Sequence, residues 1–285
     1  MSDAREWSRG DTARFLRVPG ADDDKYSRGV VGLRTGSPAY PGAAVLGVEA
    51  AWRTGAGFVR YIGEGRAADA VLARRPETVV GSHAVGARVG AWVIGSGTDA
   101  ASRTVEEERE LRQILRGAEP VVVDAGALDL AADVALEPAG DRAPTLLTPH
   151  GREFARLQRR LGVAEDSDRS RAAAAAAAAV GSVVLLKGAR TLVAAPDGGV
   201  IAVEAGTGWL STAGTGDVLG GVLGALLAAN PNADVAEVAA AGAWLHGHAG
   251  RRAAGIPEDA DGPGRPIVAL DVAEALPVVI AELLA

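Results

Sequence analysis

The 285-residue sequence contains no cysteine. This absence excludes a disulfide framework, a thiolate nucleophile and a cysteine-based metal site. Long apolar stretches are missing as well, because no uninterrupted run reaches the ~18 residues that cross a bilayer, and the first residues lack the apolar core of a signal peptide. We therefore expect a cytoplasmic protein without a membrane partner.

Basic charge and aromatic residues are both scarce. Acidic residues outnumber Lys and Arg by 36 to 29, which gives a formal net charge of −7, and aromatic residues make up 4% of the chain. This balance argues against a general nucleic-acid binder, because nucleic acids are held mostly by clustered Lys and Arg. An anionic ligand has to be held by a local site instead.

Two common phosphate-binding motifs are also absent. The sequence has no G-x-x-x-x-G-K-[ST], and the Gly214-x-Gly216 spacing does not continue into G-x-G-x-x-G directly after a predicted strand. Neither a P-loop nor a Rossmann dinucleotide site is predicted, so a phosphate site has to be sought in another loop.

The sequence does contain a regular alternation of strand and helix patterns. Strands are predicted at 30–35, 58–62, 77–80, 91–94, 120–124, 145–148 and 182–187, and helices at 43–53, 67–73, 102–116, 171–180, 218–227, 235–253 and 272–284. A turn at 196–199 joins strands 191–195 and 200–203 as a hairpin. We expect one α/β domain over residues 1–285, in which an irregular segment 1–28 precedes a three-layer α/β/α sandwich with a mostly parallel central sheet and a hairpin near one edge.

The stretch 211–221, Ser-Thr-Ala-Gly-Thr-Gly-Asp-Val-Leu-Gly-Gly, is predicted to turn from a loop into a buried helix. Gly214 and Gly216 can take positive φ and let a ligand approach the backbone, and Thr215 adds a hydroxyl donor. The first amides of a helix have no intrahelical partner and carry partial positive charge. Gly214, Thr215 and Gly216 are therefore predicted to form an anion hole for a phosphate group.

Asp217 places a carboxylate in the first turn of this phosphate-attracting helix. An acid at such a position is often only a cap or a partner of the helix dipole. Beside an anion hole it also suits phosphoryl transfer, where amides balance the charge of the moving group while the carboxylate accepts the proton of an attacking hydroxyl. The surrounding glycines favour this catalytic interpretation.

Other loops follow predicted strands at the same edge of the sheet. Residues 36–42 and 95–98 are glycine-rich, Asp124 ends a strand, and the segment 187–191 follows another. Open parallel sheets bind ligands at this edge, so these loops are predicted to share a cleft. The loop 36–42 is either a ligand loop or a tight connection, and Asp124 is either a helix cap or a cleft residue.

Three of the histidines lie in predicted helices or at their starts. His150 and Glu153 are three residues apart after a strand, where both can face one side of a first helical turn, and this favours a functional role over a structural one. His246 and His248 are two residues apart within the helix predicted at 235–253. They do not share a face of that helix, so a metal pair is not expected.

The segment 213–221 resembles the signature of the ribokinase-like ADP-dependent NAD(P)H-hydrate dehydratases, which repair hydrated nicotinamide cofactors. The resemblance covers about residues 29–285 in the family's order. It extends to Tyr40-Pro41-Gly42-Ala43-Ala44, Gly95-Ser96-Gly97, Asp124-Ala125, Thr148-Pro149-His150 with Glu153, and Lys187-Gly188 with Thr191. The family uses ADP as a co-substrate to phosphorylate the 6-hydroxyl of (6S)-NADHX or (6S)-NADPHX. Phosphate then leaves, which yields NADH or NADPH and AMP.

The matching motifs imply a role for each site residue. Asp217 would be the catalytic base, and Glu153 would organise Mg2+ through water. The hydrate would be bound by Ala43, Gly97, His150 and Asp217, and the adenine nucleotide by Lys187, Gly188, Ala189, Arg190, Thr191 and Gly216. The resemblance also implies a homotetramer. A separate NAD(P)HX epimerase would act in the same pathway, because only about 28 residues precede the first predicted strand.

One departure from the family pattern lies beside His150. Gly151 and Arg152 stand where the family usually has Pro-Gly, which can alter the substrate loop. The main alternative function is a ribokinase-like kinase acting on a hydroxymethyl vitamin precursor, because the Gly-Thr-Gly-Asp loop serves both chemistries. A catalytically silent nucleotide-binding protein is a third interpretation.

Overall fold

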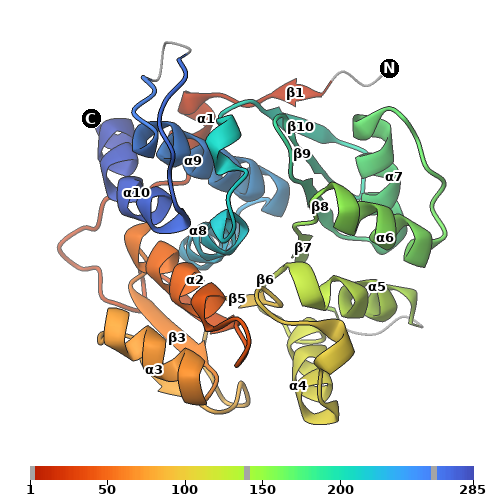
Figure 1. Cartoon of the computed structure of the whole chain (residues 1–285), viewed down its shortest axis with the longest axis horizontal. Coiled ribbons are helices and arrows are strands. Elements are labelled where there is room, and N and C mark those ends of the chain that lie inside the picture. The colour runs from red at the N-terminus through yellow and green to blue at the C-terminus, as the bar shows by residue number, and fades with distance from the viewer. Residues whose placement is uncertain (1–3, 138–141, 258–261) are drawn as a thin grey trace.

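The central sheet is shown in Figure 1, a computed structural model that describes residues 4–137, 142–257 and 262–285. Among these residues, ten strands form one sheet in the order β1-β10-β9-β8-β7-β6-β5-β2-β3-β4. The strands are β1 Arg5–Glu6, β2 Val30–Arg34, β3 Phe58–Ile62, β4 Val79–Gly81, β5 Ala91–Ile94, β6 Val121–Val123, β7 Thr145–Leu147, β8 Val183–Leu186, β9 Thr191–Ala194 and β10 Val200–Val203. Within the described sheet, β9 alone runs antiparallel to its neighbours, and it forms the predicted hairpin with β10.

Helices cover both faces of the sheet, which makes three layers. One face carries α1 Arg9–Ala13, α2 Pro41–Arg53, α3 Gly65–Arg74, α8 Thr215–Ala229, α9 Val235–Ala253 and α10 Ala269–Leu284. The other face carries α4 Val105–Leu115, α5 Leu128–Leu136, α6 Gly151–Leu161 and α7 Arg169–Val180. Strands covered in this way need apolar side chains in both directions, and all residues of β5, β6 and β8 are buried. The predicted three-layer, mostly parallel α/β fold is confirmed.

Helix α8 lies against α2 at very short range. A Cβ atom on Gly221 of α8 would be 2.2 Å from the carbonyl oxygen of Gly47 in α2, so only glycine allows this approach. Both helices begin at the carboxyl ends of the parallel strands. Their close packing fixes the first turn of α8, which carries Asp217, beside the start of α2.

The N-terminal segment differs from the irregular chain that we expected for residues 1–28. Strand β1 pairs with β10 in parallel, and α1 begins at Ser8 with a capping box. Trp7 precedes this helix and Phe15 follows it, and their buried rings stack on each other with centroids 6.1 Å apart. A capped helix between two aromatic anchors orders a segment whose overall composition is polar.

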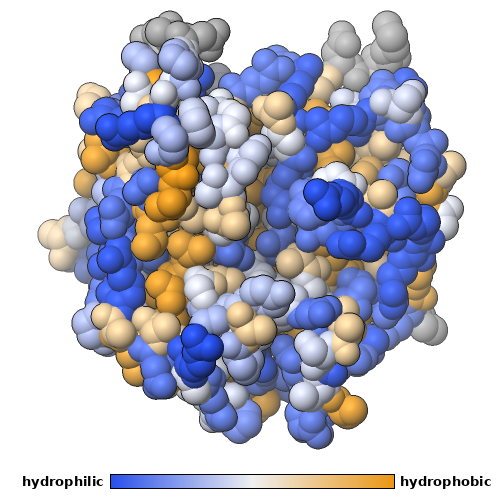
Figure 2. Space-filling model, viewed as in Figure 1, coloured by the Kyte–Doolittle hydropathy of each residue, from blue (hydrophilic) through white to orange (hydrophobic). Residues whose placement is uncertain are grey.

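The surface of the view in Figure 2 is largely hydrophilic, with hydrophobic residues gathered in a band near α2 and α10. In the described part of the chain, no helix combines the length and the apolar character that crossing a membrane requires.

Candidate active site

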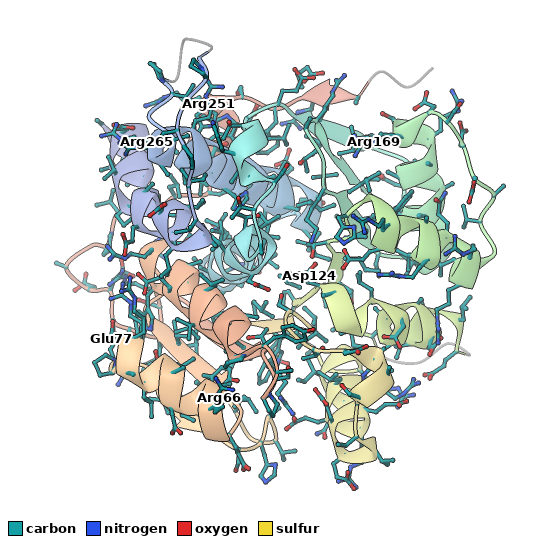
Figure 3. All side chains as sticks on the ribbon, viewed as in Figure 1. Arg66, Glu77, Asp124, Arg169, Arg251 and Arg265 are labelled. Carbon is teal, nitrogen blue, oxygen red and sulfur yellow. The ribbon has the colours of Figure 1, made fainter. Side chains whose placement is uncertain are left out.

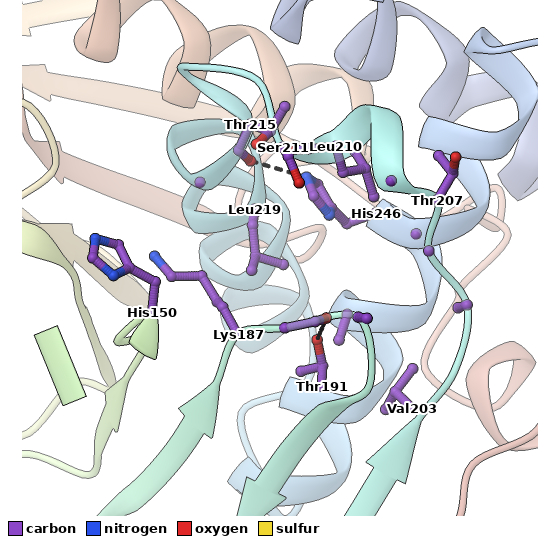
Figure 4. Close-up of a pocket in the computed structure, with 18 of the residues that line it drawn as sticks. His150, Lys187, Thr191, Val203, Thr207, Leu210, Ser211, Thr215, Leu219 and His246 are labelled. Carbon is purple, nitrogen blue, oxygen red and sulfur yellow. Dashed lines mark hydrogen bonds between the residues drawn. The ribbon is translucent and has the colours of Figure 1, made fainter. Parts of the chain in front are cut away.

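A cavity of about 560 Å³ opens between the carboxyl end of β8, the loop after β10 and the first turn of α8 (Figure 4). Five of the residues expected to bind the nucleotide line it: Lys187, Gly188, Ala189, Thr191 and Gly216. The 3-10 helix Gly208–Leu210 and part of α9 complete the wall. The structure therefore brings together the segment 187–191 and Gly216, which the sequence analysis assigned to the same nucleotide.

Arg190, the sixth residue of that set, is not among the residues that line the cavity. Its guanidinium pairs with Glu6 and, at 3.2 Å, with Glu204. Its carbonyl oxygen accepts a hydrogen bond of 3.1 Å from the guanidinium of Arg169. The side chain of Arg190 thus stabilises the sheet edge near β1, and only its backbone lies in the loop beside the cavity.

The start of α8 has the glycine geometry that an exposed helix N-terminus requires. Gly214 is the N-cap with φ of 91°, and a Cβ atom there would lie 2.5 Å from the side chain of Leu46. The Thr215 hydroxyl lies 2.8 Å from the carbonyl oxygen of Leu210 and 3.0 Å from that of Thr212. This hydroxyl holds the loop together, so the predicted anion hole has to rely on backbone amides.

Asp217 follows Gly216 directly in the first turn of α8, but it is not itself among the residues that line the cavity. Burial and the negative charge of Asp124 raise the pKa of Asp217 to about 6, although the positive charge of Lys187 opposes the shift. A carboxylate with this pKa is ionised at neutral pH and is a stronger base than an ordinary Asp.

Asp124 and Lys187 form a buried ion pair beside Asp217. The Lys187 ammonium donates to Asp124 Oδ1 at 2.8 Å, and the hydroxyls of Thr148 and Ser96 donate to the same carboxylate at 2.9 and 3.2 Å. Asp124 makes no side-chain cap to the following 3-10 helix Ala125–Ala127, and it reaches the cavity only through its bond to Lys187, which lines the cavity wall. Figure 3 shows Asp124 near the middle of the molecule, whereas the labelled arginines lie further out.

His150 and Glu153 begin α6 as a reciprocal capping box. His150 Nδ1 accepts hydrogen bonds from the amides of Arg152 at 3.1 Å and Glu153 at 3.5 Å, and Glu153 Oε2 accepts from the His150 amide at 2.9 Å. With Nδ1 acting as acceptor, the proton of the neutral ring resides on Nε2. His150 lines the cavity, and Figure 4 shows its ring beside the Lys187 amine.

Ala43 and Gly97 contact each other outside this cavity. Gly97 has φ of 66°, and a Cβ atom there would lie 2.3 Å from the Cβ of Ala43. The same helix, α2, also touches the start of α8, since Leu46 packs against Gly214. Asp217 therefore lies on a helix that has the nucleotide cavity on one side and α2, with Ala43, on another.

The carboxylates suit a magnesium ion that is bound mainly by a nucleotide. In the portion of the chain that the structure describes, no three His, Asp or Glu side chains gather closely enough to form a metal cage. Mg2+ commonly keeps several waters and binds to one or two carboxylates together with substrate phosphates. Glu153 supplies an acidic group of this kind at the start of α6, so the residues present fit such an ion.

Known proteins resemble this chain over most of its length. Residues 31–258 match the family model described as NAD(P)H-hydrate dehydratase. The chain is 38% identical over 236 residues to the ADP-dependent (S)-NAD(P)H-hydrate dehydratase of Neisseria meningitidis. The aligned residues cover 80% of this chain and 78% of that protein. It is 45% identical over 221 residues to the bifunctional NAD(P)H-hydrate repair enzyme of Mycobacterium tuberculosis. That match covers 76% of this chain but spans only 45% of the relative's own length.

A solved structure supports the fold. The ADP/ATP-dependent NAD(P)H-hydrate dehydratase of Bacillus subtilis, co-crystallised with ATP and Mg2+, superposes with a TM-score of 0.83 at 24% identity, over 99% of this chain and 100% of that one. The family match and the Neisseria relative carry the assignment beyond the fold. The chain belongs to the NAD(P)H-hydrate dehydratase family.

Proposed function

We propose that this chain catalyses the ADP-dependent dehydration of (6S)-NADHX and (6S)-NADPHX to NADH and NADPH, with release of AMP and phosphate. One observation carries the proposal: Asp217 lies in the first turn of α8, beside Gly216 in the cavity wall, and burial with the Asp124 charge raises its pKa to about 6. A base of this strength at a helix N-terminus suits proton removal from a hydroxyl that attacks a phosphoryl group.

In this proposal ADP occupies the cavity beside residues 187–191, with its β-phosphate at the amides around Gly216. Lys187 places a positive charge near the phosphates, and Asp124 holds that ammonium in position through the 2.8 Å bond. The backbone of Arg190 takes part in the nucleotide loop, while its side chain remains paired with Glu204.

The hydrate is placed on the α2 side of Asp217. Ala43 and Gly97 would line its nicotinamide end, and His150 would donate from Nε2. Asp217 accepts the proton of the 6-hydroxyl while the oxygen attacks the β-phosphorus of ADP, so that AMP departs. The C6–O bond then breaks, and loss of phosphate and a ring proton completes the dihydropyridine.

Mg2+ would be held by the nucleotide phosphates and by Glu153 through water, and when bound it would neutralise charge on the phosphates. We further propose that residues 1–285 act as one domain in a cytoplasmic homotetramer. A separate NAD(P)HX epimerase would supply the S epimer, as the bifunctional Mycobacterium relative suggests by its name.

The test is recovery of reduced-nicotinamide absorbance from purified NADHX in the presence of ADP and Mg2+. We expect wild-type protein to convert all of the S epimer to NADH, and Asp217→Asn to do so about a thousandfold more slowly at equal nucleotide occupancy. No recovery with either ADP or ATP would exclude the dehydratase function. Phosphorylation of a hydroxymethyl vitamin precursor in its place would support the kinase alternative.

A further inference from the structure

A second histidine of the cavity wall, unlike His150, is buried, and it contacts the start of α8. His246 belongs to α9, exposes 9% of its surface and lines the cavity. Its Nε2 lies 2.9 Å from the carbonyl oxygen of Thr215, and Figure 4 marks this contact with a dashed line. The proposed dehydration reaction does not use this side chain.

The protonation state of the ring follows from its surroundings. Burial lowers the pKa of His246 to about 4, despite the opposing effect of the Thr215 hydrogen bond, and Lys187 adds to the decrease. The ring is therefore neutral at physiological pH. A carbonyl oxygen only accepts hydrogen bonds, so Nε2 carries the proton and Nδ1 carries a lone pair.

The Nδ1 atom is left for a ligand. The Thr215 contact is made by Nε2, and Nδ1 makes no hydrogen bond to any other described residue. It is also not one of the fully buried atoms that lack a partner. Nδ1 is therefore unpartnered and partly accessible, and the side chain that carries it lines the cavity.

Helix α9 cannot easily move the ring away from this position. A Cβ atom on Gly247 would lie 2.7 Å from the backbone of Ala205, and one on Gly250 would lie 2.6 Å from the side chain of Leu210. These contacts pack α9 directly against the loop that forms another part of the cavity wall. The imidazole is thus held between that loop and the first turn of α8.

We propose that His246 both recognises the adenine nucleotide and positions the helix that carries the base. Its Nδ1 accepts a hydrogen bond from a ribose hydroxyl or from the adenine amino group, while Nε2–H holds the Thr215 carbonyl and, with it, the turn that contains Gly216 and Asp217. The identity of the ligand as an adenine nucleotide rests on the proposed function.

Two amide substitutions separate the two contacts. Asparagine places an amide oxygen at about the position of Nδ1, so His246→Asn keeps the acceptor and loses the bond to Thr215. Glutamine places an amide N–H at about the position of Nε2, so His246→Gln keeps the bond to Thr215 and loses the acceptor. His246→Leu loses both contacts at a similar volume.

The experiment measures the Kd for ADP by calorimetry and kcat separately. We expect His246→Gln to weaken ADP binding about fivefold to tenfold with kcat nearly unchanged. For His246→Asn we expect a loss in kcat of about tenfold, because the base is displaced, with Kd nearly unchanged. His246→Leu should show both losses. His248→Leu is the matched control, since His248 lies on the same helix and its Nδ1 contacts the Trp244 carbonyl instead of lining the cavity.

The donor on the nucleotide is identified with analogues. If His246 accepts from a ribose hydroxyl, the penalty of His246→Gln disappears with 2′-deoxy-ADP or 3′-deoxy-ADP. If it accepts from the amino group, the penalty disappears with purine riboside diphosphate. A penalty that persists with all three analogues, or glutamine and asparagine variants that change Kd and kcat together, would overturn the proposal in favour of a purely structural histidine. Wild-type protein that binds ADP without turning over NADHX would contradict the proposed function and leave this inference standing.

Discussion

Two buried carboxylates of this protein have opposite environments. Glu49 in α2 is fully buried, yet hydrogen bonds from Arg75, Arg53 and Arg74 outweigh the effect of burial and lower its pKa to about 2. Asp217 in α8 is also largely buried, but its pKa is raised to about 6 by burial and by Asp124. The first carboxylate is surrounded by cations, whereas the second shares one lysine with another acid.

This difference separates a stabilising group from a reactive one. The lowered pKa of Glu49 contributes stability above pH 4.5, which is lost as the pH falls toward 2. The raised pKa of Asp217 means that the folded protein prefers the protonated form. Its contribution is therefore present below pH 3.8 and is lost as the pH rises through 6. At neutral pH the ionised Asp217 therefore lowers the stability of the fold, and its benefit to the protein is its basicity.

The largest effect is expected from Asp217→Asn. Removing the base should lower kcat by about a thousandfold, while the neutral amide relieves the burial of a charge and stabilises the fold by about 1–3 kcal/mol at pH 8. Initial rates and thermal melting measure the two changes in one sample. A variant within tenfold of the wild-type rate would contradict the role of Asp217.

Glu49→Gln is expected to act in the opposite way. The change leaves three arginines without their buried anion and should destabilise the protein by about 3 kcal/mol at pH 7.5, as measured by urea unfolding. The kcat of the folded fraction should not change. Glu77→Gln is the control, because Glu77 pairs with Arg75 at 3.3 Å but has an exposed side chain and should change stability by less than about 0.5 kcal/mol.

Asp124→Asn and Lys187→Met test the charges that set the basicity of Asp217. Asp124 raises the pKa of Asp217 and Lys187 lowers it. The acid limb of the pH–rate profile should therefore move to lower pH in the asparagine variant and to higher pH in the methionine variant, in addition to any loss of rate. Limbs that move in the same direction would show that these charges do not control the base.

The smallest effect is expected from Arg53→Gln. The Arg53 side chain is 35% exposed, and Glu49 keeps its bonds to Arg74 and Arg75. The loss should be no more than about 1 kcal/mol in urea unfolding. A loss of stability as large as that of Glu49→Gln would mean that Arg53 alone holds the Glu49 carboxylate, instead of all three arginines sharing it.

The sequence predicted what was local. Gly214 to Asp217 are consecutive, so the helix start and its acid could be recognised without tertiary information. The alternation of apolar strands and helices was enough to predict the layered sheet, because buried parallel strands need apolar residues on both faces. His150 and Glu153 were predicted to lie together at the start of a helix, and they do so as a capping box.

What the sequence could not predict depends on contacts between distant segments. Asp124 follows β6 and Lys187 follows β8, and only β7 lies between these two strands. Residues 63 positions apart in the sequence can therefore pair. His246 meets Thr215 across 31 residues, and its spacing to His248 showed only that the two would not form a metal pair. Arg190 could not be separated from its loop neighbours, because its direction depends on Glu6 and Glu204.

Asp217 is a buried base whose pKa is raised to about 6. The most direct measurement is kcat/KM for NADHX dehydration from pH 4.5 to 8.5 at saturating ADP. The structure predicts an acid limb with unit slope and a midpoint near 6, because the protonated carboxyl cannot accept the hydroxyl proton. A profile that stays flat down to pH 4.5 would contradict this assignment.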